Sequence, residues 1–342
     1  KPQNVKKVSQ VIAEADIMAT AVGVNVLPKI INPLISGFKK RWEQDNYNPL
    51  NIIICENKID ADKYLKNLII EKLNSSEIKN FKKTIGLVKA SIGRMVPVIT
   101  EEIKAKDPLK IVVEPYSKLP VDKTGFKKEI PDIKNMIPFA PFNFYIQRKL
   151  FMHNMSHALT AYIGYLYDYT YIWEAVRNPV IKFIISKALQ ESARALAREH
   201  KVDLEKLLKY GDNLVYRFNN QALGDSVKRV GRDPLRKLSQ NDRLVGAAEL
   251  CLKHNIKPVY IISGIAAAGF FDPEEDESAE IIQKKLKNKD YIQVLKEISN
   301  LDGNSRNKML WETVELFFNL FAAKKDLPDI LNQAEKIKQK VR

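Results

Sequence analysis

The chain has 342 residues, which is long enough for two domains and a sizeable core. Its composition, 45% hydrophobic and 28% charged, is ordinary for a globular protein. Its longest apolar run, residues 259–271, is shorter than the roughly 20 residues that a membrane helix needs. The net charge of +15 comes from lysines spread along the chain, so we expect neither nucleic acid nor a membrane as a partner.

The cysteines and histidines indicate no disulfide framework and no metal site. Cys55 and Cys251 form no C-x-x-C motif, which favours a reducing, cytoplasmic location. The four histidines lack the spacing of a paired metal motif, and we expect no metal. The first residues do not have the pattern of a secretory signal.

Strand-like and helix-like patterns alternate through the first part of the chain. Predicted strands cover residues 15–23, 50–57, 84–92 and 110–116, and predicted helices cover 28–42, 58–72 and 75–83. This alternation is typical of a parallel sheet with right-handed crossovers. Ligands of such sheets bind at the carboxyl ends of the strands, where Gly23 and the segment Cys55-Glu56-Asn57 lie.

The second part of the chain has helical periodicity throughout. We expect a domain with a parallel sheet over residues 1–118, a crossing rich in proline and lysine over 119–141, and an all-helical domain over 142–342. Asp203 and Ser305 have the side chains of helix N-caps. The predicted helices are 144–167, 172–177, 180–199, 203–218, 242–254, 259–268, 278–287, 290–298, 305–323 and 327–342.

Three polar residues in the first of these helices have a spacing that points to chemistry. Lys149, Asn154 and His157 follow the pattern K-x4-N-x2-H in a mostly apolar stretch. In an α-helix, Asn154 and His157 share a face, and Lys149 lies about 12 Å from His157 along the axis. A lysine with a lowered pKa can accept a proton, an amide can stabilise an oxyanion, and an imidazole can bind a hydroxyl. The pattern suits alcohol and ketone chemistry, although such residues are more often the solvated edge of an amphipathic helix.

The glycine-rich turn of a dinucleotide-binding domain is absent from the sequence. No two of the 13 glycines are separated by a single residue, so there is no G-x-G-x-x-G motif. Either the chain binds no dinucleotide or it begins partway through such a domain. We expect the parent protein to contain an upstream segment of about 60 residues, at about 30 residues per βαβ unit. We also expect the chain starting at Lys1 to bind NAD poorly, and the residue that distinguishes NAD from NADP to lie upstream.

The most specific motif is residues 229–244, Arg-Val-Gly-Arg-Asp-Pro-Leu-Arg-Lys-Leu-Ser-Gln-Asn-Asp-Arg-Leu. This motif resembles a signature of the polyol-specific long-chain dehydrogenases, the mannitol dehydrogenase family. Further segments resemble that family in the same order: 20–23, 49–53, 55–57, 121–124, 148–151 and 217–220. The resemblance runs from about Ala15 to Ser305, most of the chain.

The resemblance implies a Rossmann-type NAD domain, an all-helical substrate domain and a site between them. It implies reversible hydride transfer between NAD and mannitol 1-phosphate, giving fructose 6-phosphate. Lys149 would be the general base, Asn57 and Asn154 would hold the alkoxide, and His157 would bind a substrate hydroxyl. Lys149 would take the place of metal activation. The residues expected at the cofactor are Thr20, Ala21, Val22, Gly23, Glu56 and Asn57.

The basic residues of the motif are candidates for the substrate phosphate, because arginine binds phosphate bidentately. These candidates are Arg232, Arg236 and Lys237. The alternative is that some of them pair with neighbouring carboxylates, namely Asp225, Asp233 and Asp242.

Several positions depart from the family pattern and leave the substrate open. Lys89, Gly93 and Leu119 stand where the family commonly has other residues. A sibling enzyme that reduces a hexuronate such as fructuronate or tagaturonate is one alternative. A dehydrogenase-derived binding protein without activity is another. We expect a phosphorylated sugar alcohol or ketose as the partner and a monomer, with a dimer left open.

Overall fold

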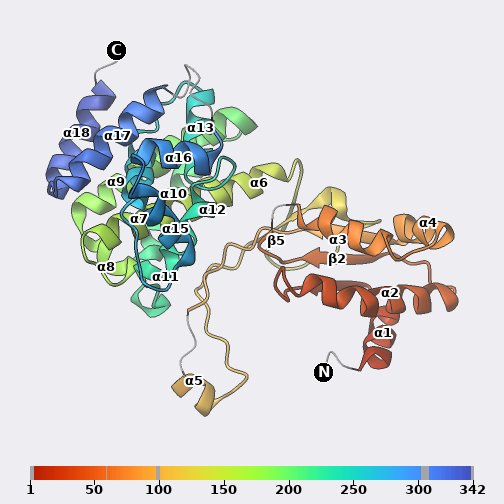
Figure 1. The fold of residues 1–342 in the computed structure, drawn as a ribbon. Coiled ribbons are helices and arrows are strands. Elements are labelled where there is room, and N and C mark those ends of the chain that lie inside the picture. The colour runs from red at the N-terminus through yellow and green to blue at the C-terminus, as the bar shows by residue number, and fades with distance from the viewer. Residues whose placement is uncertain (1–3, 59, 98–100, 302–307, 340–342) are drawn as a thin grey trace. The chain divides into compact units, whose positions relative to one another are not determined.

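The computed structural model describes residues 4–58, 60–97, 101–301 and 308–339, which form two compact units. The first unit consists of Lys1–Arg94 and Pro115–Ile146, and we call it the sheet unit. The second consists of Met95–Glu114 and Gln147–Arg342, and we call it the helical unit. Each unit has its own set of elements (Figure 1).

The sheet unit is built on a three-stranded parallel sheet in the order β1-β2-β3. The strands are β1 (Ile17–Thr20), β2 (Leu50–Ile54) and β3 (Ile85–Lys89). Ile17 lies opposite Asn51, and Leu50 lies opposite Ile85. The predicted strand–helix alternation and the parallel sheet are confirmed, with each strand shorter than its sequence pattern.

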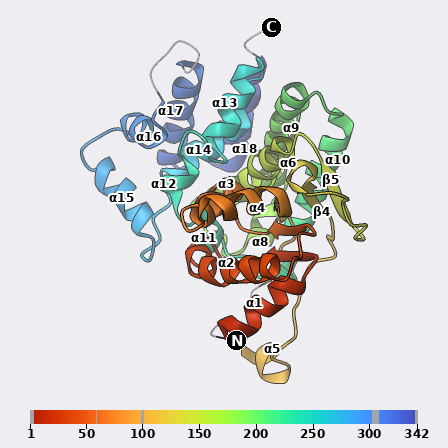
Figure 2. The same cartoon turned by 90° about the vertical axis from the view of Figure 1, so that its right-hand side faces the viewer.

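The two faces of this sheet have different coverings, because successive side chains of a strand point to opposite faces. Leu50, Ile52 and Ile54 belong to one core with α2 (Leu27–Glu43), α3 (Ala61–Ile70) and α4 (Ser75–Thr84). Ile53 and Val88 belong to a second core with Val121 and Phe126. Figures 1 and 2 show α2 running alongside α3 and α4. The helix α1 (Val5–Glu14) packs on α2.

A second sheet follows where no strand was predicted. It pairs β4 (Leu119–Asp122) with β5 (Met136–Phe139) in parallel, and η1 (Lys123–Gly125) lies between them. The predicted strand over residues 110–116 is wrong. Its apolar residues are left exposed: Ile111 is 74% exposed and Val113 is 40% exposed. An apolar run becomes a strand only when another strand completes its hydrogen bonds.

The helical unit has most of the helices that periodicity predicts. The bounds of α8 (Ile172–Arg177) and α14 (Val259–Ala268) match the prediction, and Asp203 caps α10 as predicted. The predicted cap Ser305 lies outside the described residues. The remaining elements of this part of the chain are α5 (Glu101–Lys106), α6 (Asn143–Arg148), η2 (Lys149–Asn154), α7 (Met155–Leu166), α9 (Pro179–His200), α10 (Leu204–Phe218), η3 (Gln221–Leu223), α11 (Val227–Gly231), α12 (Pro234–Lys237), α13 (Val245–Lys253), α15 (Glu277–Leu286), α16 (Tyr291–Ser299), α17 (Lys308–Ala322) and α18 (Leu327–Gln339).

Helix α14 is the centre of the helical unit. All of its residues are buried, and α7, α9 and α17 pack around it. A Cβ atom at Gly264 would lie 2.8 Å from Leu159 of α7, so this glycine sets how closely α7 approaches. Although α14 is apolar, no described helix has both the length and the hydropathy to cross a membrane.

Candidate active site

The three residues of the K-x4-N-x2-H pattern lie on a helix whose geometry changes partway. The segment η2, Lys149–Asn154, is a π-helix, and α7 continues from it. A π-helix has i→i+5 hydrogen bonds and is often found at functional sites. Its wider turn brings residues five apart, as Lys149 and Asn154 are, closer to one face than an α-helix would. The sequence carries no pattern from which this turn could be predicted.

Lys149 has the electrostatic surroundings of a general base. Burial, followed by the positive charge of Arg243, lowers the pKa of Lys149 to about 8. Both causes disfavour the charged ammonium form. A base is most effective when its pKa lies near the working pH, and Lys149 approaches that condition.

His157, on α7, is held as a neutral ring. Its imidazole stacks on Phe218, with ring centroids 4.7 Å apart and an interplanar angle of 11°. Burial and the charge of Arg229 lower the pKa of His157 to about 3. Its Nε2 lies 3.4 Å from Asp225 Oδ2 without hydrogen-bond geometry, and the ring is uncharged at neutral pH, so this contact is no ion pair. A neutral imidazole can donate a hydrogen bond to a hydroxyl or accept one from it.

A second histidine lies beside it, one that the sequence did not indicate as a site residue. The ring centroid of His153 is 6.1 Å from that of His157 and 5.8 Å from that of Phe218. The Nδ1 atom of His153 is buried and has no hydrogen-bond partner among the described residues. Burial lowers the pKa of His153, so this ring is also neutral. Its position one helical turn before His157 was the sequence feature that could have identified it.

Two arginines near these rings are paired with carboxylates. Arg217 forms a bidentate pair with Glu114, and its Nε donates to Glu114 Oε2 at 2.8 Å. Glu114 also accepts a hydrogen bond from the backbone amide of Met95. Arg229 pairs with Asp225. The pairing of Glu114 with Arg217 joins residues more than a hundred positions apart, and local spacing could not predict it.

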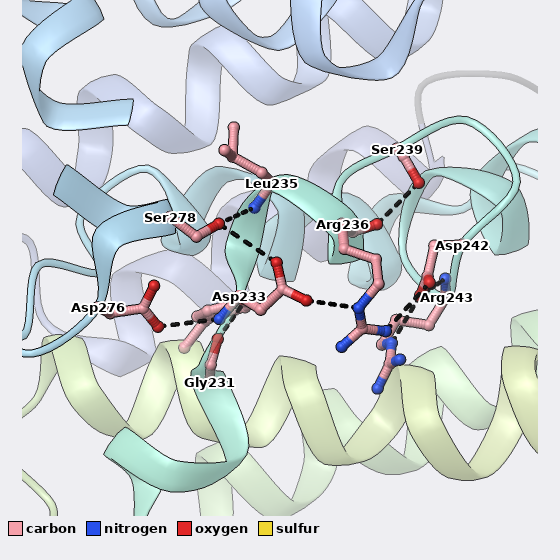
Figure 3. A network of polar contacts seen from close by, with 10 residues as sticks. Gly231, Asp233, Leu235, Arg236, Ser239, Asp242, Arg243, Asp276 and Ser278 are labelled. Atoms are coloured by element: carbon pink, nitrogen blue, oxygen red, sulfur yellow. Dashed lines mark hydrogen bonds and ion pairs between the residues drawn. The ribbon is translucent and has the colours of Figure 1, made fainter. Parts of the chain in front are cut away.

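The motif of residues 229–244 forms the polar network of Figure 3. Arg236 Nε donates to Asp233 Oδ2 at 2.5 Å, and its Nη1 lies 3.4 Å from Asp242 Oδ2. Arg243 Nε donates to Asp242 Oδ1 at 2.7 Å. The backbone amide of Asp233 donates to Asp276 Oδ2 at 2.9 Å. Arg236 therefore pairs with carboxylates, as the alternative reading of the motif expected. Its role toward phosphate stays a prediction.

Lys237 and Arg232 differ from Arg236 in their exposure and in their contacts with carboxylates. Lys237 is only 4% exposed, and within the described ranges no carboxylate pairs with it. Burial and the charges of Arg243 and Arg236 lower the pKa of Lys237 to about 7. Arg232 is exposed. A buried lysine among other cations is suited to an anionic group of a ligand.

In the sheet unit, the predicted cofactor residues gather at the carboxyl ends of β1 and β2. The Glu56 carboxylate accepts hydrogen bonds from the backbone amides of Val22 and Gly23, each at 2.9 Å. Gly23 has φ +87°, and a Cβ atom there would meet no atom within 4 Å, so the turn is open on that side. The buried Thr20 hydroxyl has no hydrogen-bond partner in the described part of the chain. Asn57 follows Glu56 directly.

This turn fits a flat group of a ligand better than a phosphate. The carboxylate of Glu56 already occupies the two amides, and its negative charge would repel a pyrophosphate. The open face at Gly23 leaves room for a ring, and the Thr20 hydroxyl can bind one of its polar atoms. Among the described residues, no group of three or more His, Cys, Asp or Glu side chains could hold a metal ion.

Comparisons with known proteins place both halves of the chain in one group. A model described as the mannitol dehydrogenase Rossmann domain matches residues 1–135. A model described as the mannitol dehydrogenase C-terminal domain matches residues 142–338.

Three similar proteins carry the name mannitol-1-phosphate 5-dehydrogenase. The one from Thermoanaerobacter pseudethanolicus is 37% identical, over 92% of this chain and 80% of its own. The one from Bacillus licheniformis is 36% identical, over 85% and 76%. The one from Clostridium acetobutylicum is 35% identical, over 87% and 77%.

Solved structures of low sequence identity share the fold. A D-sorbitol dehydrogenase in substrate-free form has a TM-score of 0.76 at 14% identity, covering 94% of this chain and 76% of its own. A Pseudomonas fluorescens mannitol 2-dehydrogenase in a ternary complex with NAD and D-mannitol has a TM-score of 0.67 at 16% identity, covering 98% and 77%.

Proposed function

The chain belongs to the mannitol dehydrogenase family and is an oxidoreductase acting on a CH–OH group, and we propose that it interconverts mannitol 1-phosphate and fructose 6-phosphate with NAD. The observation that carries the proposal is Lys149, a half-buried lysine whose pKa is lowered to about 8, in a segment that resembles the family's catalytic helix. The names of the similar proteins support the substrate.

In the proposed mechanism, the substrate hydroxyl gives its proton to Lys149 Nζ. When bound, the cofactor would supply the acceptor for the carbinol hydrogen, which is transferred as hydride. Negative charge develops on the substrate oxygen, and the amide of Asn154 stabilises it by donating a hydrogen bond. We assign the same role to Asn57, which follows β2 in the sheet unit. A neutral amide donates to an alkoxide without competing for the proton.

The cofactor would be held through Thr20, Ala21, Val22 and Gly23, supported by Glu56. The fit rests on the open side of the Gly23 turn and on the Thr20 hydroxyl, which can bind one polar atom of the cofactor. Glu56 would act by fixing the backbone of the turn.

His157 and Lys237 would bind the rest of the substrate. The neutral ring of His157 suits a hydroxyl, and the ammonium group of Lys237 suits the phosphate. Arg232 would add a second cation, because it is exposed and forms no ion pair with a carboxylate in the described part of the chain. Arg236 would contribute at longer range while it keeps its carboxylate pairs.

An NADH-oxidation assay of the full-length protein with fructose 6-phosphate, fructose and tagaturonate tests the substrate. The proposal expects fructose 6-phosphate to react with the highest kcat/KM. A preference for tagaturonate would favour the hexuronate reductase, because Lys237 also suits a carboxylate. Turnover of none of these ketoses would contradict the proposed reaction.

A further inference from the structure

A cavity of about 440 Å³ lies at α8, α9 and α10, on residues that the proposed reaction does not use. The buried side chains of Val176 and Val215 form its apolar part. A volume of about 300–1,000 Å³ is usual for a small-molecule site, and most of the side chains that line this cavity are polar. The other lining residues are Arg177, Lys182, Ser186, Asp212, Tyr216 and Asn219.

Arg177 is held in position before any ligand binds. Its guanidinium lies 4.5 Å from the ring centroid of Trp173, and its Nε donates to Asn219 Oδ1 at 3.0 Å. Trp173 itself stacks on Tyr171 at an interplanar angle of 16°. These contacts use one face and one edge of the guanidinium. Its terminal nitrogens stay available for the paired oxygens of an anion.

Lys182 supplies a second cation at the corner where α8 meets α9. It lies near the start of α9, a helix of 22 residues whose amino end carries a partial positive charge. In the described ranges, neither Lys182 nor Arg177 forms an ion pair with a carboxylate. The corner therefore brings two cations to one side of the cavity, and Asp212 is the carboxylate among its lining residues.

The other side of the cavity suits a ring with hydroxyl groups. Tyr216 is 78% exposed, an unusual state for a large aromatic side chain, and its ring can stack on a flat ligand. Asp212 can accept hydrogen bonds from hydroxyl groups.

We propose that this cavity binds a nucleoside monophosphate or a close analogue. The phosphate would contact Arg177 and Lys182, the base would stack on Tyr216, and the ribose hydroxyls would face Asp212. This inference does not depend on the proposed substrate.

Isothermal titration calorimetry with adenosine 5′-monophosphate tests the proposal, with the full-length protein kept in saturating NADH so that the cofactor site is filled. We expect one molecule to bind per chain. Arg177→Gln and Lys182→Gln should each weaken binding at least tenfold, and Tyr216→Ala should weaken it as well. Lys187→Gln is the matched control, because Lys187 lies on the same helix but over Phe183 and outside the cavity.

Two further probes separate the parts of the ligand. Inorganic phosphate and adenosine should each bind more weakly than the monophosphate. Equal binding of phosphate and the monophosphate would overturn recognition of the ring. Binding that none of the three variants alters, or no binding, would overturn the site itself. Circular dichroism checks that each variant is folded.

Discussion

At the scale of single residues, the proposed chemistry depends on the charge of Lys149. An exposed lysine has a pKa near 10.4 and is almost fully protonated at pH 7. Burial and Arg243 lower the pKa of Lys149 to about 8, so a useful fraction is neutral at mildly alkaline pH. Burial, followed by the charge of Arg229, keeps His157 neutral by lowering its pKa to about 3.

Removal of the proposed base should abolish most turnover. Lys149→Ala should lower kcat about 10²- to 10⁴-fold, the usual contribution of general acid–base catalysis. Binding of NADH to the full-length variant, followed by fluorescence titration, should change little, because the cofactor is assigned to the other unit. Turnover like that of the unaltered protein would remove Lys149 from the mechanism.

The dependence of kcat on pH should have opposite signs for alcohol oxidation and for ketone reduction. Alcohol oxidation needs neutral Lys149, so kcat should rise with pH up to about 8 and then level off. Ketone reduction needs the protonated lysine as an acid, so kcat should be constant below pH 8 and fall above it. Profiles measured for both directions in one buffer series check this prediction. Profiles with the same sign in both directions would contradict it.

A substitution of Arg243 tests what lowers the pKa of Lys149. Arg243→Gln removes a positive charge near Lys149, so the inflection of both profiles should move to higher pH. Arg236→Gln is the matched variant, because Arg236 also pairs with Asp242 but is not among the charges that lower the pKa of Lys149. An equal movement in both variants would show that the effect comes from Asp242.

At the scale of elements, close helix packing can be tested at a glycine. Gly264→Ala places a Cβ atom 2.8 Å from Leu159, so α14 and α7 must separate. We expect the free energy of unfolding in urea to fall by about 1–3 kcal/mol, the usual cost of overpacking. Gly211→Ala on α10 is the control, because its nearest neighbour would be 3.4 Å away and alanine favours helix. Equal stability of the two variants would contradict the packing argument.

The elements also show what the sequence could predict. The resemblance to the mannitol dehydrogenase family, the parallel sheet and the helical second part are confirmed. Periodicity located α8 and α14 because α8 buries one face in a core and α14 is buried on all sides. It failed over residues 110–116, where apolar residues lack a partner strand, and it missed β4 and β5, whose pairing joins segments apart in sequence.

The site was predictable in the same uneven way. The spacing singled out Lys149, Asn154 and His157 as candidates, and their catalytic roles stay predictions. The π-helix that changes their relative positions was not found, because it depends on how the surrounding helices pack. Glu114 was missed for a related reason, since its partner Arg217 is brought to it by the fold.

At the scale of the whole molecule, the net charge of +15 has a consequence for the proposed substrate. A positively charged protein attracts an anionic ligand over distances of about a Debye length, about 10 Å at 0.1 M salt. The field raises the rate of encounter, and added salt screens it. The proposed buried contact with Lys237 should be screened much less.

The kcat/KM for fructose 6-phosphate should therefore fall as KCl is raised from low ionic strength, while kcat changes little. The fall should appear in KM, because kcat is measured after the sugar phosphate is bound. Sucrose at matched osmolality is the control, because it changes water activity without screening charge. If sucrose lowers kcat/KM as much as KCl does, the long-range field makes no contribution, and recognition of the phosphate rests on local contacts such as the one proposed for Lys237.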